Sequence, residues 1–208
     1  MNILKPQKLF LNNLVEIDEL KSEDIIENAK IENKIFDDLQ VYKVEFEKVI
    51  FNNVCIQNGK LDGSSFVDVE FKNCNFSNSS FENSSFVRCE FNNCKLTGVN
   101  FTESRFYNVG VIESNLNYTN FSMASLDSVL FSNSGLISSN FGENKLKNIY
   151  LKNSDLTKAT FYKTSLKNID LSDSNIAGIS VQLEDIKGAI IEEYQSIDLL
   201  YLLGVKLK

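Results

Sequence analysis

The sequence contains no histidine. The side chains left that could take part in chemistry are carboxylates, lysines, tyrosines and four cysteines. Histidine is the usual general base and the commonest metal ligand, so its absence weighs against an enzyme or a metal centre. The spacing of Cys55, Cys74, Cys89 and Cys94 matches no CxxC metal or redox pattern. We therefore expect no catalytic, cofactor-binding or metal-binding residues and no small-molecule substrate.

The composition is that of an ordinary globular chain, with 43% hydrophobic and 24% charged residues. No apolar run approaches the roughly 18–20 residues that a membrane helix needs. The first residues, Met1 to Pro6, lack the apolar core and small-residue cleavage site of a signal peptide. The sequence thus predicts a cytoplasmic protein with no membrane partner.

The elements that must position these side chains follow a period of five residues. Every fifth residue from Phe46 to Val181 is apolar, and all but two of the 16 phenylalanines occupy this column. A strand buries every second side chain and a helix buries those three or four apart, so neither explains the period. Ile31, Phe36 and Val41 keep the same period, which allows the repeat to begin earlier.

Two further columns indicate the path of the backbone. Two residues before each centre the side chain is small or β-branched, as at Val44, Ser64 and Cys74, and we expect it to point inward. Two residues after each centre Asn and Gly are common, as at Asn53 and Gly63, and both tolerate the positive φ of tight turns. Each pentad therefore predicts a short extended side followed by a corner. Four sides close a square coil, and such coils stack about 4.8 Å apart into an all-β solenoid.

The same columns assign the cysteines to structure. Cys74, Cys89 and Cys94 fall in the small inward column and are expected to fill the core, whereas Cys55 points outward. Cys74 and Cys94 lie one coil apart, near enough for a disulfide, but core burial and a cytoplasmic setting disfavour the bond.

Pentads such as CNFSN (74–78) and SDLTK (154–158) resemble the pentapeptide repeat, A(D/N)LXX. The resemblance extends over most of the chain and implies a right-handed quadrilateral β-helix, here of about seven or more coils. It does not by itself imply a function.

The two ends depart from the repeat. Ser22, followed by Glu23 and Asp24, is typical of a helix start. We therefore predict a helical or irregular N-terminal cap over 1–33, the β-helix over 34–183, and a C-terminal helix and tail over 184–208 that form a dimerisation module.

The predicted C-terminal helix runs from Glu192 to Leu203, since acids stand at its start and Gly204 follows its end. Capping the rod would use Ile197, Leu200 and Leu203, and the remaining apolar side chains favour a second surface. We predict a homodimer, with a monomeric cap as the alternative. The predicted interface consists of Tyr194, Ile197, Leu199, Leu200, Tyr201, Leu202 and Leu203.

The C-terminal pattern from Gln195 to Val205 also resembles the C-terminal module of the quinolone-resistance and mycobacterial fluoroquinolone-resistance pentapeptide proteins. That resemblance implies end-to-end pairing of two rods and mimicry of duplex DNA toward DNA gyrase. A DNA mimic needs dense negative charge, but residues 41–180 carry 14 acidic and 13 basic side chains. A DNA-mimicking modulator of gyrase that confers fluoroquinolone protection therefore remains the alternative function.

Outward positions of such a rod should be polar, yet two groups are apolar or aromatic. The first is Val67, Val87 and Tyr107 on one face, and the second is Ile112, Leu130 and Tyr150 around the adjoining corner. A contiguous patch indicates a partner, whereas β-propensity alone is the plain alternative. The leading prediction is a non-enzymatic, rigid scaffold that binds an unidentified protein partner and no nucleic acid directly.

Overall fold

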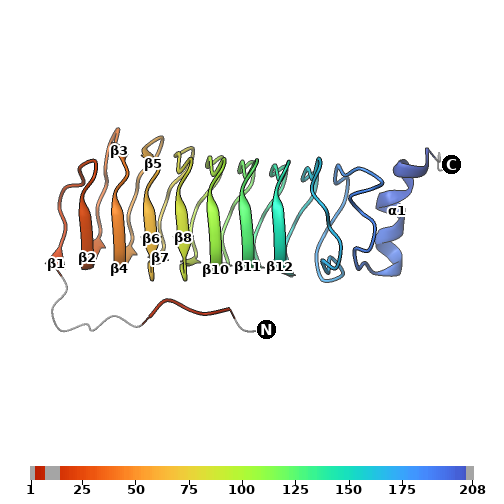
Figure 1. Ribbon diagram of the computed structural model, residues 1–208, viewed down its shortest axis with the longest axis horizontal. Helices are drawn as coiled ribbons and strands as arrows, with labels where there is room; N and C mark the ends of the chain where they lie inside the picture. The colour runs from red at the N-terminus through yellow and green to blue at the C-terminus, as the bar shows by residue number, and fades with distance from the viewer. Residues whose placement is uncertain (1–2, 8–14, 205–208) are drawn as a thin grey trace.

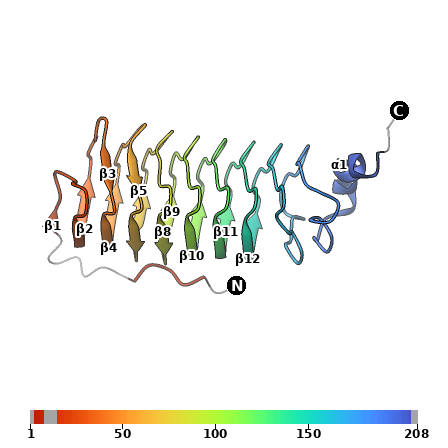
Figure 2. The same cartoon turned by 45° about the horizontal axis from the view of Figure 1, so that its top comes forward.

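A computed structural model of the chain describes residues 3–7 and 15–204. Most of these residues wind into stacked coils, seen as a row of aligned strands in Figures 1 and 2. The strands of neighbouring coils pair in parallel and join residues 20 apart, as in Phe46 with Phe66 and Phe66 with Phe86. One coil therefore contains four pentads, and the fold is the predicted β-solenoid.

Some strands continue through a corner and are long, and others stop at it and are short. The long strands are β2 (Ile25–Glu32), β4 (Glu45–Asn52), β10 (Arg105–Ile112), β11 (Ser125–Ser132) and β12 (Lys145–Lys152). The short strands are β1 (Val15–Glu16), β3 (Gln40–Tyr42), β5 (Lys60–Asp62), β6 (Ser65–Val67), β7 (Glu70–Lys72), β8 (Ser85–Val87) and β9 (Glu90–Asn92).

The main sheet runs in the order β1-β2-β4-β6-β8-β10-β11-β12, and β7 and β9 pair alongside it. From β2 to β12 this order has seven rungs, which enclose about six turns of the solenoid. β3 and β5 form a second, two-stranded sheet on another side of the coil. Isolated bridges carry the parallel pairing on to Asp170 and Ile190.

The corners lie where the sequence places Asn and Gly. Asn53, Gly63 and Asn73 all have positive φ, between 53° and 67°, and the same conformation recurs at five-residue intervals. An L-residue enters this region at a cost, which Gly avoids and Asn tolerates best. Stacked corner amides also bond to one another, as in Asn93 Nδ2 to Asn73 Oδ1 at 2.7 Å.

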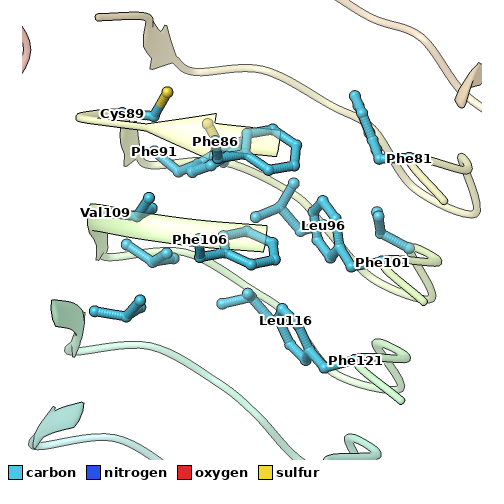
Figure 3. Close-up of a cluster of buried hydrophobic side chains, with 14 of the residues drawn as sticks. Phe81, Phe86, Cys89, Phe91, Leu96, Phe101, Phe106, Val109, Leu116 and Phe121 are labelled. Atoms are coloured by element: carbon cyan, nitrogen blue, oxygen red, sulfur yellow. The ribbon is translucent and has the colours of Figure 1, made fainter. Parts of the chain in front are cut away.

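The core is a set of aromatic and aliphatic ladders along the axis of the solenoid, part of which is shown in Figure 3. The rings of Phe71 and Phe91 stack with centroids 4.4 Å apart, and those of Phe66 and Phe86 with centroids 4.7 Å apart. Every centre predicted between Phe46 and Val181 is buried except Leu146, which is half-buried beside a small apolar cavity near β12.

The helical form of the predicted N-terminal cap is wrong in the described residues, and residues 1–2 and 8–14 of that cap lie outside them. Residues 25–32 form β2, which pairs with β4 along its whole length, so the solenoid begins before position 34. Ile26 and Ile31 supply the buried centres and Ala29 the small inward side chain, so tertiary pairing outweighs the local helix signal. Ser22 serves a turn instead, because its Oγ accepts a hydrogen bond from the amide of Tyr42.

The predicted C-terminal helix is confirmed in position. It consists of the 3₁₀ helix η2 (Glu193–Gln195), the α-helix α1 (Ser196–Leu199) and the 3₁₀ helix η3 (Leu200–Leu203). Gly204 follows with φ 68°, the left-handed conformation expected after a helix. Of the helices in the described residues, none has the length and apolarity that spanning a membrane requires.

Candidate interaction surfaces

The buried cysteines act as inward side chains of the coil. The Sγ atoms of Cys74, Cys89 and Cys94 each lie 3.4–3.5 Å from a backbone carbonyl of the preceding coil. Ser84 and Ser104 make the same contact with their hydroxyl groups. Burial raises the pKa of the Cys89 thiol to about 12, and a contact with Cys74 together with burial raises that of Cys94. These thiols are therefore structural.

The outward apolar side chains align as the period predicts. Val67, Val87 and Tyr107 are direct partners on β6, β8 and β10. Leu130 and Tyr150 are partners on β11 and β12, in a column whose preceding member is Gly110. Ile112 lies two residues beyond Gly110, in a third column. Of the six residues predicted as a partner surface, Tyr107 is the most exposed, at 49%, and the other five are half-buried.

Residues 3–7 lie back across this face of the solenoid. Figures 1 and 2 show the segment running along the coils, roughly perpendicular to the strands. The amide of Gln7 donates to Asp68 Oδ1 at 3.0 Å, and that of Leu4 donates to Asn108 Oδ1 at 3.4 Å. The Lys5 ammonium lies 3.8 Å from a Glu90 carboxylate oxygen. We call residues 3–7 the strap.

Under the strap, Asp68 and Arg88 form a two-bond ion pair between neighbouring coils. Arg88 Nε and Nη2 donate to the two carboxylate oxygens of Asp68, each at 2.7 Å. Burial opposes ionisation of Asp68, but the guanidinium and the Gln7 amide outweigh it, so its pKa lies below its ordinary value. The strap thus docks on a carboxylate that stays ionised and is fixed in orientation.

Sequence reasoning did not place the strap on this face. The signal available was Pro6, the single proline of the chain. A proline restricts its own φ and keeps the residue before it extended, so it favours an extended segment over a helix. Nothing in the sequence indicates which coils such a segment contacts, because the contacts join residues up to 104 positions apart.

The C-terminal end of the solenoid is closed by polar contacts. The Gln195 side chain is 1% exposed, and its Nε2 donates to the carbonyls of Leu171 at 3.0 Å and Ser174 at 2.7 Å. The Tyr201 hydroxyl donates to the carbonyl of Ile179 at 2.9 Å and accepts from the amide of Val181 at 3.1 Å. Coil edges that would otherwise be unpaired therefore find partners in the helical segment.

The face of the helical segment that packs on the core differs from the one predicted. Leu199 and Leu202 pack against the core, whereas Ile197 and Leu203, predicted to cap it, are exposed. Gln195, Leu199 and Leu202 share one side of the segment, and the buried hydrogen bonds of Gln195 to the last coils turn that side toward the core. Tyr194 is exposed as well, so an apolar face remains at this end.

Several surface charges on the described residues are paired locally. Lys72 contacts Glu70, and Lys147 Nζ lies 2.8 Å from an Asp127 carboxylate oxygen. Hydrogen bonds and the charge of Lys147 lower the pKa of Asp127. Among the described residues, no group of three or more cysteine, aspartate or glutamate side chains is placed to hold a metal ion.

Coil geometry and comparison with known sequences define the class of the protein. Residues 84–161 match the family model described as a pentapeptide repeat region, and residues 64–102 match the one for pentapeptide repeats. The predicted resemblance to pentapeptide-repeat proteins is therefore confirmed. Among curated proteins, no sequence relative matches the chain.

Solved structures give the particular likenesses. A trypsin-treated variant of QnrB1, a plasmid-mediated fluoroquinolone resistance protein, superposes with a TM-score of 0.50 at 18% identity, covering 93% of this chain and 96% of that chain. HetL, a pentapeptide repeat protein involved in heterocyst differentiation regulation from the cyanobacterium Nostoc sp. strain PCC 7120, superposes with a TM-score of 0.42 at 13% identity, covering 81% and 87%. At these identities the QnrB1 likeness shows the fold alone.

Proposed function

We propose that this protein is a non-catalytic, rigid scaffold that binds a protein partner through outward side chains of its coils. The observation that carries the proposal is the aligned apolar side chains of Val67, Val87 and Tyr107, with Leu130 and Tyr150 around the corner. They point away from the core, which is built from the inward columns of each coil. Stacked coils hold such side chains at a fixed spacing of about 4.8 Å, so little conformational entropy is lost on binding.

The test is capture of partners on immobilised full-length protein. Leu130→Lys places a charge in the apolar column, and Tyr118→Lys makes an equivalent change at an exposed corner on another side of the coil. We expect a protein that is retained by the wild type and by Tyr118→Lys and is lost from Leu130→Lys. Identical capture by all three proteins contradicts this surface.

The C-terminal helical segment supports a second part of the proposal, a homodimer. Tyr194, Ile197 and Leu203 are exposed on one short segment, at 59–67%. Exposed apolar side chains at the end of a rod are most simply covered by a second copy across a two-fold axis.

Modulation of DNA gyrase by DNA mimicry is the second candidate function. The C-terminal sequence pattern and the likeness in fold to QnrB1, a fluoroquinolone resistance protein, favour it. The nearly neutral rod disfavours it, since a mimic requires dense negative charge. The test is a DNA gyrase supercoiling assay in which this protein is titrated, with and without a fluoroquinolone. Inhibition or drug protection at micromolar protein supports gyrase as the partner, and no effect leaves the scaffold with another partner.

A further inference from the structure

The corner under the strap differs from the other corners of the solenoid. Among the described residues with positive φ, Asp68 and Asn108 are the two that are buried, at 1% and 4% exposure. Corresponding residues one or more coils away on the same corner, such as Asn28 and Asn148, are exposed. Gly110 is buried too, although it occupies an outward position. The strap covers this one stretch of corner, which we call the corner track (Asp68, Arg88 and Asn108).

The spacing of the strap matches the spacing of the coils. Asp68 and Asn108 are two coils apart, which is about 10 Å. Leu4 and Gln7 are three residues apart, which in a polyproline II conformation is about 9 Å. That conformation has three residues per turn, so the amides of residues 4 and 7 point to the same side. Pro6 favours this conformation both for itself and for Lys5. The strap can therefore bond to every second coil without strain.

The acceptors of the track are held ready for such a segment. Arg88 fixes the Asp68 carboxylate, and Asp68 Oδ1 accepts from Arg88 Nε as well as from the Gln7 amide. Glu90 lies between the two amide sites and faces the cation of Lys5. Neither hydrogen bond depends on the side chain of residue 4 or 7, since both are donated by backbone amides.

The strap itself is weakly held. The side chain of Lys5 is 79% exposed, so its ion pair with Glu90 contributes little. Leu4 is also mostly exposed. Two backbone hydrogen bonds and one exposed ion pair can be exchanged for the same contacts from another chain, while Val67, Val87 and Tyr107 beside the track offer further apolar contact.

We propose that the corner track is a binding site for an extended peptide segment of a partner protein, with a basic residue and a proline between two backbone amides three residues apart. The strap occupies the track in cis, and the partner segment displaces it. This proposal rests on the scaffold function proposed above and names the part of the surface and the chemistry of the partner.

The experiment measures binding of a fluorescein-labelled peptide with the sequence of residues 1–8 to full-length proteins by fluorescence anisotropy. Gln7→Pro removes the amide that bonds to Asp68 and keeps the extended backbone, so it frees the track. Gln7→Ala keeps the amide and is the matched control. We expect the peptide to bind the Gln7→Pro protein roughly tenfold or more tightly than either the wild type or Gln7→Ala, because a hydrogen bond to a charged group is lost from the competing strap.

Two further measurements assign the binding to the track. Adding Asn108→Ala to Gln7→Pro should weaken peptide binding severalfold, because it removes the second acceptor. A peptide with proline at its own position 7 should bind weakly to every protein. A cooperative urea transition shows that each variant is folded.

Equal binding to all full-length versions, or no binding to any of them, overturns the corner track as a peptide site. That result leaves the scaffold proposal standing, because the scaffold is tested separately by partner capture with Leu130→Lys. If the wild type, Tyr118→Lys and Leu130→Lys capture the same proteins while the peptide still binds the Gln7→Pro protein more tightly, the Leu130 surface is overturned and the corner track is not.

Discussion

Arg88 and Asp68 join neighbouring coils through two parallel hydrogen bonds of 2.7 Å, on a corner where Asn28 and Asn148 of other coils are exposed. Asp68 also accepts a hydrogen bond from the Gln7 amide, so the pair lies at one end of the contact between the solenoid and the strap. Because Asp68 is 1% exposed, its charge depends on Arg88 and on the amide of Gln7 for compensation.

Replacing Arg88 should therefore destabilise the fold more than an ordinary surface change. We expect Arg88→Met to lower the free energy of unfolding by about 1–3 kcal/mol, since it leaves a buried carboxylate short of partners. Adding Asp68→Asn should restore part of that loss. Urea denaturation of the two single variants and the double variant measures the effect, and additive losses would contradict a coupled pair.

The same pair predicts a dependence on pH. The pKa of Asp68 is lower in the folded protein than in the unfolded chain, where it is about 3.9. Its contribution is therefore fully present above that value and is lost as the pH falls through the folded pKa. The stability difference between wild type and Asp68→Asn should be constant from pH 7 to about 5 and should shrink below about 4. A difference that grows on acidification would show the opposite shift.

The core ladder predicts a sharp contrast between adjacent residues. Phe91 is 1% exposed and stacks on Phe71, whereas Asn92 points outward. We expect Phe91→Ala to lower the free energy of unfolding by about 3–5 kcal/mol through the cavity it leaves, and Asn92→Ala by well under 1 kcal/mol. Equilibrium denaturation compares them, and equal effects are incompatible with this register.

The corners predict a gain in stability. Met123 has φ 58° at an exposed corner, a conformation that Asn tolerates better. We expect Met123→Asn to stabilise the protein by about 0.5–1 kcal/mol, and the reverse exchange Asn58→Met, at φ 55°, to destabilise it by a similar amount. Thermal melts of both variants provide the measurement, and shifts of the same sign would refute the explanation.

The cysteines predict a difference in reactivity. Burial raises the pKa of Cys89 to about 12, and Cys74 and Cys94 are also buried in the core, while Cys55 is half-buried at an outward position. Because the thiolate is the reactive form, iodoacetamide at pH 8 should modify Cys55 in the folded protein and all four cysteines after unfolding. Mass spectrometry identifies the sites, and rapid labelling of Cys89 in the folded protein would contradict its burial.

The exposed end of the rod predicts the oligomeric state. If two copies pair through Tyr194, Ile197 and Leu203, Ile197→Lys should convert the dimer to a monomer without unfolding it. Tyr118→Lys, at an exposed corner of the rod, should leave the mass unchanged. Light scattering after size exclusion gives both masses. A wild-type monomer at all concentrations contradicts the dimer.

Much of the solenoid could be predicted because its determinants are local and repeated. The Phe column and the corner residues, such as Asn53 and Asn73, repeat the same pattern in each pentad. One atypical pentad therefore does not change the predicted fold. The N-terminal region was predicted wrongly because one local signal, Ser22 with its following acids, competed with a register visible in only a few residues. The hydrogen-bonded pairing of β2 with β4 makes residues 25–32 a strand rather than a helix.

Sequence alone thus determined the coil, its period and the position of the C-terminal helix, since each depends on neighbours five residues or one turn away. The tertiary structure decided which face of that helix packs, through Leu199 and Leu202 rather than Ile197 and Leu203. It also decided where the strap lies, because Gln7 meets Asp68 across 61 residues and Leu4 meets Asn108 across 104. Such contacts depend on the distance between stacked coils, which no local pattern contains.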